Sequence, residues 1–274
     1  MLKNVFIKII KPKPEEFLAA CEANYLAKVK EFLDRGAGAN TKGRAPAIAL
    51  NNAVKKANVP LIKLLLENGV DPHEKDGAGE IALVRAAFHN NIEVALLLLE
   101  NGCDINRRNS DGKTAFMEAC YYGRRDMAEV LLNKGAQLGT KDNKGNTEFM
   151  WASWSGHFEI VEFLLENGVD VNEVNSKNGR TALMESVISG KVPLVELLLK
   201  NGAHPDKKDN EGESALDRAV KKGSTDIIGM LEQALDEHSK KSAIERKEKE
   251  ALVLRQVCDL SLKRPLKVKP PLGF

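Results

Sequence analysis

The segment Leu164-Leu165-Glu166-Asn167-Gly168 is one of six versions of a five-residue phrase that recurs along the chain. Each version ends in a glycine, and successive glycines lie 33, 33, 33, 33 and 34 residues apart. These glycines are Gly36, Gly69, Gly102, Gly135, Gly168 and Gly202. One unit of this length cannot bury its own apolar face, so a constant period predicts units that stack on one another. The phrase therefore predicts a solenoid.

A second phrase recurs at the same period and predicts the start of a helix in each unit. It reads Thr114-Ala115-Phe116-Met117 in one unit. The other copies begin at Ile48, Ile81, Thr147, Thr181 and Ser214. Threonine and serine are favoured N-cap residues, and glycine is favoured just past a helix C-terminus. Each unit therefore predicts a turn rich in Asp, Asn and Gly, a short first helix, a glycine break and a second helix.

Together these phrases resemble the consensus of the ankyrin-repeat family. The family's T-P-L-H-x-A box corresponds here to T-A-L/F-M-x-A/S. Its G-A-D-V-N turn corresponds to Gly102-Cys103-Asp104-Ile105-Asn106 and to Gly168-Val169-Asp170-Val171-Asn172. The resemblance covers six to seven copies, and it implies an all-α solenoid of paired helices joined by β-hairpin-like turns. A fold does not determine a function, so the resemblance leaves the partner open.

The repeats divide the chain into three predicted parts. Residues 1–14 form an N-terminal extension, residues 15–238 form the ankyrin-repeat domain, and residues 239–274 form a charged helix and a basic, proline-rich tail. The helical part has apolar residues at about helical spacing. From Lys263 onward the chain has four basic residues, three prolines and no acidic residue. This composition predicts a flexible, basic end.

Composition and charge exclude several classes of protein. The 274 residues include 41 Lys and Arg against 39 Asp and Glu, which gives no reason to expect specific nucleic-acid binding. No run reaches the ~18 or more apolar residues of a membrane span. The four cysteines form no CxxC pair and have no matching histidine spacing, which disfavours a disulfide scaffold, a zinc site and a secreted chain. We therefore expect a soluble, monomeric protein in the cytoplasm, with the nucleus as the alternative.

The sequence contains no recognisable catalytic motif. The five histidines lie in different parts of different repeats, and no Ser-His-Asp, HExxH or P-loop arrangement is present. Cys120 occupies an alanine-like position in a first helix, which favours a buried, inert thiol over a nucleophile. We therefore expect a non-enzymatic protein that has no catalytic residue, cofactor or metal ion and that acts by binding.

The candidate binding site is built on a first-helix position that lies fourteen residues before each terminal glycine. In the family, this position points into the concave groove of the array. Its residues along the chain are Glu22, Lys55, Phe88, Tyr121, Trp154, Ile188 and Lys221. Four consecutive repeats carry a large apolar group there, and lysine follows at both ends. Stacked repeats lie ~10 Å apart, so these groups predict a stripe ~30 Å long, with the apolar core and charged rim of an interface.

Neighbouring positions complete the predicted site. Tyr122 follows the groove position, and the position three residues before it supplies Arg85, Glu118 and Glu185. The same earlier position holds Trp151, which we expect to pack between helices. These residues predict a scaffold that binds a peptide or protein segment in its concave groove. A competing possibility is that the chain's own tail fills the stripe.

A ubiquitin-ligase substrate receptor is the first alternative function. Leu254, Cys258 and Leu262 are spaced as in the Elongin-binding box that some ankyrin proteins carry after their last repeat. The resemblance implies that this helix would bind Elongin, while the repeats would select a substrate. Val253 stands where the box usually has a small residue, and no Leu-Pro-x-Pro cullin segment follows.

Binding of a small oligoadenylate-type ligand is the second alternative. Residues 114–119 with Tyr122 resemble the oligoadenylate-binding repeat of the interferon-linked ribonuclease. The resemblance implies that Glu118 and Tyr122 would contact an adenine. Lys113 replaces a stacking aromatic of that repeat, and Asp76 replaces its phosphate-binding lysine. The reversed charge at the phosphate position disfavours this function.

Overall fold

The chain folds as a row of paired helices. The computed structural model describes residues 13–37 and 44–262, without the side chains of residues 242, 243, 245–247 and 251–262. The first helices of the pairs are α1 (Pro14–Glu22), α3 (Ala45–Lys55), α5 (Ala82–Phe88), α7 (Ala115–Tyr121), α9 (Glu148–Ser155), α11 (Ala182–Ser189) and α13 (Ala215–Lys222). The second helices are α2 (Leu26–Phe32), α4 (Val59–Glu67), α6 (Ile92–Glu100), α8 (Arg125–Asn133), α10 (Phe158–Glu166), α12 (Val192–Lys200) and α14 (Thr225–Leu262).

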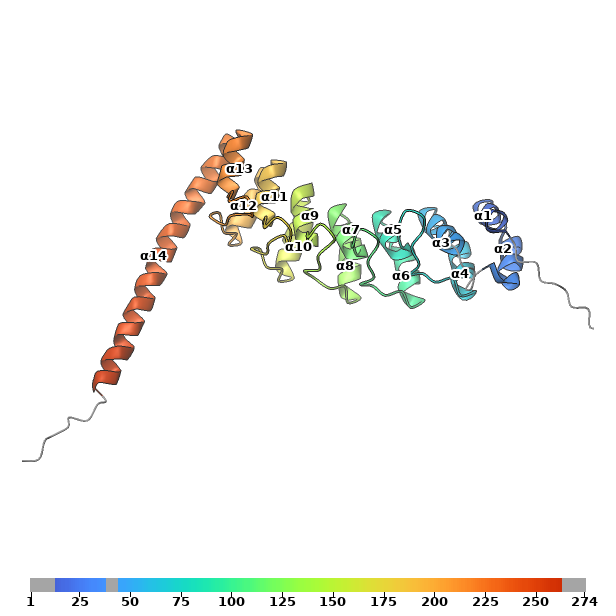
Figure 1. Cartoon of the computed structure of the whole chain (residues 1–274), viewed down its shortest axis with the longest axis horizontal. Coiled ribbons are helices and arrows are strands. Elements are labelled where there is room, and N and C mark those ends of the chain that lie inside the picture. Colours follow the sequence, from blue (N-terminus) through green and yellow to red (C-terminus); the bar gives the residue numbers. More distant parts are fainter. Residues whose placement is uncertain (1–12, 38–43, 263–274) are drawn as a thin grey trace, which may run out of the picture.

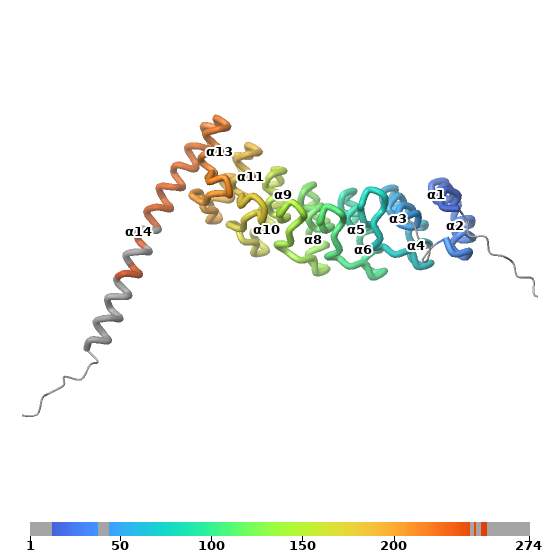
Figure 2. The backbone as a smooth tube through the Cα atoms, in the orientation of Figure 1, coloured from blue at the N-terminus to red at the C-terminus, as the bar shows by residue number. Residues whose placement is uncertain are grey.

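The first and second helices form two separate rows along the array (Figure 1). Each first helix packs against its own second helix and against the first helices of the neighbouring pairs, as α7 does with α5 and α9. The backbone steps from pair to pair in one direction along the array (Figure 2). Since the extensive contacts all link neighbouring pairs, the core is a continuous ribbon that runs the length of the stack.

Hydroxyl side chains begin α7, α9, α11 and α13, the first helices whose copy of the recurring phrase starts with Thr or Ser. The Oγ1 atoms of Thr114, Thr147 and Thr181 accept hydrogen bonds from backbone N–H groups three residues later, at 3.2, 3.4 and 3.3 Å. Ser214 does the same with Asp217, whose carboxylate accepts the Ser214 N–H in return, so the two form a capping box. These bonds satisfy N–H groups that a helix start otherwise leaves without a partner.

Leucines of the five-residue phrase form the centre of the core. Their side chains recur at the repeat period, and each has no exposed surface. They are Leu65, Leu98, Leu131, Leu164 and Leu198. Alanines of the first helices, including Ala86, Ala119 and Ala152, are equally buried and allow the helices of adjacent pairs to approach closely. The leucine and alanine positions together explain why the period is visible in the sequence.

Buried Asp and Asn residues hold the turns between pairs. They are Asp76, Asn109, Asp142, Asn175 and Asp209, which share the repeat period. In each case the Oδ1 atom accepts two backbone N–H groups of its own turn, as Asp142 does from Lys144 and Asn146 at 2.9 and 2.8 Å. These bonds fix the turn shape, as Asx side chains do in tight turns.

The all-α solenoid predicted from the sequence is confirmed. The turns before α11 and α13 each close with one antiparallel bridge, Val174 with Thr181 and Lys208 with Ser214. Helix α14 continues through position 238 without a break, so the predicted domain boundary there is not a break in secondary structure. In the part of the chain that the structure describes, none of the helices has the length and apolar content of a membrane span.

Glu148 is a buried acid at the first residue of α9. It has no exposed surface, whereas every other copy of the phrase has alanine at this position. Its Oε1 atom accepts the Gly139 N–H at 2.6 Å, but its Oε2 atom has no hydrogen-bond partner. Burial raises the pKa of Glu148 from 4.5 to about 7, although the Gly139 bond acts in the opposite direction.

Replacing Glu148 with glutamine is expected to stabilise the protein at pH 8. Since its pKa is higher in the folded than in the unfolded state, the folded state binds the extra proton between pH 4.5 and about 7, and stability falls as the pH rises through this range. Keeping Glu148 ionised in the folded state above pH 7 costs about 3 kcal/mol. The glutamine avoids this cost, but its buried amide N–H group has no acceptor, which costs about 1–2 kcal/mol. Urea unfolding should therefore show a gain of about 1–2 kcal/mol at pH 8 and none at pH 5.

The exposed Glu159 on the next helix provides the matched control. Glu159→Gln should leave the stability profile unchanged between pH 5 and pH 8. A Glu148→Gln variant whose stability falls with pH as steeply as that of the wild type would contradict the assignment.

Candidate functional site

Five rings from three successive first helices form an aromatic row. The row consists of Phe88 on α5, Tyr121 and the adjoining Tyr122 at the end of α7, and Trp151 and Trp154 on α9. Phe88 meets Tyr122 edge to face at 4.8 Å between ring centroids, and Tyr122 meets Tyr121 at 4.7 Å. Tyr121 then meets Trp151 edge to face at 5.1 Å and stacks on Trp154 at 6.3 Å. The rings thus touch in sequence across three repeats.

The two ends of the aromatic row are the most exposed. Phe88 is 39% exposed and Trp154 is 42% exposed, while Tyr121, Tyr122 and Trp151 are half-buried. Ring pairs of this kind contribute about 0.5–1.5 kcal/mol beyond the area that they bury. The row is therefore pre-ordered by its own contacts and still presents apolar surface to solvent.

Ile188 continues the groove position on α11. It is half-buried, and its carbonyl oxygen accepts a hydrogen bond from Lys222 Nζ at 2.6 Å. Ile188 has no ring, so it is not part of the ring cluster. It extends the predicted stripe by one repeat without adding to the ring cluster.

Lys113 places a positive charge against the centre of the row. Its Nζ atom lies 4.6 Å from the ring centroid of Tyr121 and 5.2 Å from that of Trp151. The same atom pairs with Glu118 Oε2 at 3.2 Å, and both side chains are largely buried. Burial raises the pKa of Glu118, and the charge of Lys113 opposes that rise. This arrangement fixes the ammonium by cation–π attraction and by an ion pair.

The side chains three positions before the groove position bond polar groups within the array. Arg85 donates to Asp76 Oδ2 at 2.8 Å and to Asn51 Oδ1 at 3.2 Å. Trp151 donates its indole N–H to Asp142 Oδ2 at 2.9 Å, which agrees with the predicted packing role. These side chains therefore hold the turn to the first helix, and they leave less of their polar surface available to a ligand.

Glu118 and Glu185 have the same internal role. Glu118 is buried against Lys113, and the half-buried Glu185 lies 3.9 Å from Arg180. Burial raises the pKa of Glu185, and Arg180 lowers it. Phe88, Tyr121, Tyr122 and Trp154 thus provide the apolar surface of the predicted site, while Arg85, Glu118 and Glu185 are paired within the array.

The lysines at the two ends of the predicted stripe differ in their environment. In the described residues, the side chains of Lys55 and Lys56 are exposed and make no hydrogen bond or ion pair. Lys221, in contrast, forms an ion pair with Glu213, and the ammonium of Lys222 bonds the carbonyl oxygen of Ile188. The lysine side chains without any partner therefore lie at the α3 end of the stripe.

Arg124 adds a second unpaired cation near Phe88. Its guanidinium makes no ion pair among the described residues, and its buried Nε atom has no hydrogen-bond partner. His89, the residue after Phe88, meets the Phe88 ring edge to face, with 4.8 Å between the ring centroids. Burial lowers the pKa of His89, and the positive charges of Arg85, Lys55 and Arg124 lower it further. One end of the aromatic row is thus electropositive.

Residues that could carry out chemistry lie in structural positions. Cys120 is fully buried, and this burial raises its pKa well above the usual value, so the thiol stays protonated. His157 contacts the carbonyl oxygen of Tyr121 through Nε2 at 3.0 Å. A Cβ atom on Gly123 would lie 2.6 Å from the His157 ring, so this close approach requires glycine. The ring holds the end of α7, where two members of the row lie.

A stack of helix pairs that joins neighbour to neighbour is the architecture of a helical-repeat protein. The family model "Ankyrin repeats (3 copies)" matches residues 17–109, 106–175 and 149–241. The chain therefore belongs to the ankyrin-repeat family, as the sequence phrases predict. Ankyrin repeats are generally protein–protein interaction modules, and proteins of the family are typically non-enzymatic scaffolds. No curated protein matches the chain.

Lys113, Arg124 and the turn acids were not predicted as part of the groove site. A signal for the acids is present, because Asp76, Asp142 and Asp209 each precede by nine residues the side chain that they bond. No comparable spacing identifies Lys113, which reaches both rings through its long side chain.

The two alternative functions have different outcomes. The structure gives the oligoadenylate-type site no support, because Lys113 covers the rings and Asp76 is bonded to Arg85. The Elongin-box alternative stays a prediction. The backbone of α14 is helical through Leu262, while the side chains at 254, 258 and 262 lie outside the described set.

Proposed function

We propose that this chain is a non-enzymatic protein-interaction scaffold and that the aromatic row binds a segment of a partner protein. The proposed segment carries large apolar side chains, with acidic residues at the end that meets α3. The main support is the exposure of Phe88 and Trp154, at 39% and 42%, within a pre-ordered ring cluster. Exposed aromatic anchors with a charged rim are typical of interface hot spots.

The apolar part of the partner follows from the spacing of the exposed rings. Phe88 and Trp154 belong to first helices separated by one further pair, so the row spans two repeat steps of ~10 Å each. An extended peptide rises about 3.3 Å per residue, so about six residues cover this distance. Large side chains at alternate positions would meet the rings, which favours an extended segment.

The acidic part follows from the charge at the α3 end. The side chains of Lys55 and Lys56 at this end, and that of Arg124 in the turn between α7 and α8, have no ionic partner among the described residues, whereas Lys221 is paired with Glu213. Carboxylates of a partner would gain most beside the unpaired cations. The proposal therefore fixes both the composition of the segment and its direction along the array.

The described part of α14 supports an occupant from another protein. It packs against α12 and α13 and then extends away from the array (Figure 1). The tail remains the competing occupant. If the tail fills the row, a chain that ends at Glu250 should bind selected peptides more tightly than the full chain. Equal affinities are expected under the proposal.

Selection from a displayed library of random peptides tests the proposal directly. Peptides retained by the full chain should be enriched in aromatic and branched apolar residues, with Asp or Glu at one end. Their affinities for wild type and variants follow from fluorescence anisotropy of synthetic peptides. Failure to enrich any sequence, or enrichment of basic peptides, would contradict the proposed chemistry.

Reversing the charges at Lys55 and Lys56 is expected to slow association of a selected acidic peptide. The double change to glutamate should lower the association rate roughly tenfold at low ionic strength, because steering depends on unpaired charge near the site. The difference should shrink in high salt, which screens exposed charges. Stopped-flow measurements at two salt concentrations provide the test.

Lys221 provides the matched control for this experiment. Because Lys221 lies on α13, at the opposite end of the stripe from the proposed acidic residues, screening by salt should keep the effect of Lys221→Glu on the association rate below about twofold. An equal effect of the changes at both ends would show that the partner has no fixed direction.

A further inference from the structure

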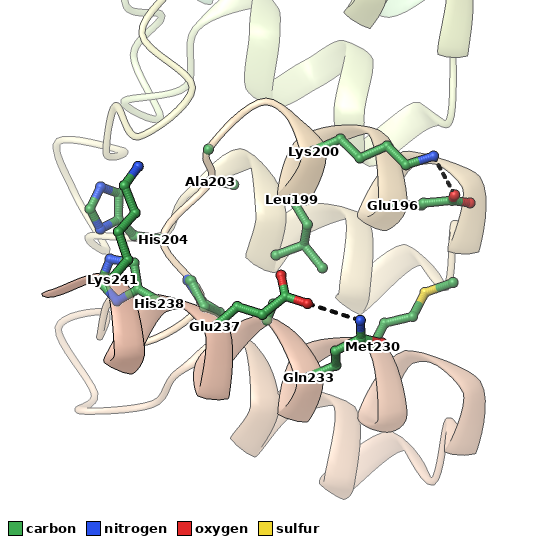
Figure 3. A pocket seen from close by; sticks show the side chains of 13 residues that line it. Glu196, Leu199, Lys200, Ala203, His204, Met230, Gln233, Glu237, His238 and Lys241 are labelled. Atoms are coloured by element: carbon green, nitrogen blue, oxygen red, sulfur yellow. Dashed lines mark hydrogen bonds and ion pairs between the residues drawn. The ribbon is translucent and has the colours of Figure 1, made fainter. Parts of the chain in front are cut away.

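The junction between the last complete turn and α14 holds a side-chain cluster outside the aromatic row. A cleft of about 750 Å³ separates the end of α12 and the turn after it from α14. His204 and Pro205 line it on one side, and Met230 and His238 line it on the other. The imidazoles of His204 and His238 lie close together at one end of this cleft (Figure 3).

Asp206 completes a group of three possible metal ligands. The ring centroids of His204 and His238 are 4.9 Å apart. Asp206 Oδ1 lies 4.0 Å from His204 Nδ1, and Asp206 Oδ2 lies 3.9 Å from His238 Nδ1. One ligand atom from each residue lies within 4.8 Å of the other two. The three side chains thus converge on one point from two elements that are distant in the sequence.

The lone pairs of this group are unused. In the described residues, none of the three side chains makes a hydrogen bond within 3.5 Å, since the contacts of Asp206 with both rings are longer. A second acidic group, Asp209 with its neighbours, differs in this respect, because Arg218 and Lys221 neutralise it. Of these two groups in the described residues, the histidine group is the one whose nitrogen and oxygen lone pairs are not engaged by a neighbouring side chain.

Two imidazoles and a carboxylate are a ligand set that suits zinc. Zinc binds histidine nitrogen and carboxylate oxygen at about 2.0–2.2 Å, so ligand atoms of a tetrahedral site lie about 3.4 Å apart. The observed spacing therefore needs to close by roughly an ångström. All three side chains are partly exposed, so small rotations about their side-chain bonds permit this closure.

We propose that His204, Asp206 and His238 bind one Zn²⁺ ion, with water as the fourth ligand. Since His238 lies on α14 and the other two ligands lie in the turn after α12, the ion would fix α14 against the last complete turn. This proposal departs from the expectation of no metal ion, which rested on the spacing of cysteines and histidines in the sequence. The proposed site uses no cysteine, and its two histidines are brought together by the packing of α14. It is independent of partner binding at the aromatic row.

Two further charged groups lie near the site. Glu237 adjoins His238, and its Oε1 atom accepts a hydrogen bond from Gln233 at 3.0 Å. The exposed Lys241 also lines the cleft and follows His238 by three residues on α14 (Figure 3). Its ammonium opposes a bound cation but can move into solvent on its flexible side chain. Lys241→Ala should therefore retain zinc binding or strengthen it.

Isothermal titration of the full chain with zinc chloride at pH 7.5 is the primary test. Wild type should bind zinc with one strong site. His204→Ala, His238→Ala and Asp206→Asn should each weaken binding at least about tenfold, since even the loss of outer-shell partners weakens metal sites about 10–100-fold.

His73 supplies a matched control. This turn histidine also pairs with one carboxylate, Asp71, at 3.0 Å, but no second imidazole is near. His73→Ala should leave zinc binding intact. The backbone N–H of His204 bonds Asn172, and alanine keeps that bond, so His204→Ala should fold normally in circular dichroism.

The proposed effect on α14 has a separate readout. Zinc should slow amide hydrogen exchange in the first part of α14 in wild type and not in His238→Ala. The metal site is overturned if wild type binds no zinc, or if binding survives the loss of both histidines. The fixing of α14 is overturned if zinc binds and exchange is unchanged.

Discussion

Replacing Leu131 with alanine is expected to lower the free energy of unfolding by about 2–5 kcal/mol. Leu131 lies in α8, near the middle of the array, and its side chain has no exposed surface. The change removes buried methyl groups and leaves a cavity that neighbouring pairs on both sides line. Since each pair of a solenoid is stabilised mainly by its neighbours, damage at the centre weakens two interfaces.

The adjacent Leu132 provides a control with the same chemical change. Leu132 is only partly buried, so Leu132→Ala should cost about half as much or less. Urea unfolding followed by far-ultraviolet circular dichroism reports the whole array, whereas fluorescence of Trp151 and Trp154 reports its centre. A loss below about 1 kcal/mol for Leu131→Ala would contradict its place in the core.

The fold could be predicted because every repeat needs the same types of residue at the same positions. Buried leucines such as Leu98 and Leu131 recur at a fixed distance, and Thr114 and Thr147 begin helices through side-chain caps. These are local or periodic properties, so they are visible without knowledge of the packing. The same reasoning applies to the glycines that end the helices.

Departures from the period could not be predicted in the same way. Glu148 replaces a buried alanine, and its environment depends on Gly139 from the preceding turn. Helix α14 lacks the glycine that ends the other second helices, so it continues beyond the array. The sequence indicates that the helix can continue, but its direction depends on packing against α12 and α13.

The candidate site was predictable in its apolar part and less so in its polar part. The register of Phe88, Tyr121 and Trp154 follows from counting back from the terminal glycines. The ion pairs of Glu118 and Lys221 depend on which long side chains reach them. These partners do not recur at the repeat period, so the period does not reveal them. Polar groups near an interface are therefore harder to assign than aromatic ones, because many partners are within reach.

Replacing Trp154 with alanine is expected to weaken binding of a selected peptide by about 2–4 kcal/mol, which corresponds to roughly 30- to 1,000-fold in Kd. Trp154 is 42% exposed, and it stacks on Tyr121 and meets Trp151 edge to face. Its indole therefore offers a rigid apolar surface that a partner side chain can cover. The variant loses this surface and also the support that keeps Tyr121 in place.

The two ring contacts also set the expected effect on folding. Each aromatic pair contributes about 0.5–1.5 kcal/mol, so the loss of both should reduce the stability of Trp154→Ala by about 1–3 kcal/mol, below the middle of the range expected for Leu131→Ala. Phe158 is the matched control, because it is 40% exposed and lies on α10 outside the aromatic row. Phe158→Ala should leave peptide affinity within about twofold of wild type, since a residue outside the hot spot contributes little. If Trp154→Ala instead lowers stability by as much as Leu131→Ala and leaves affinity intact, Trp154 is a packing residue. The partner would then bind elsewhere on the array.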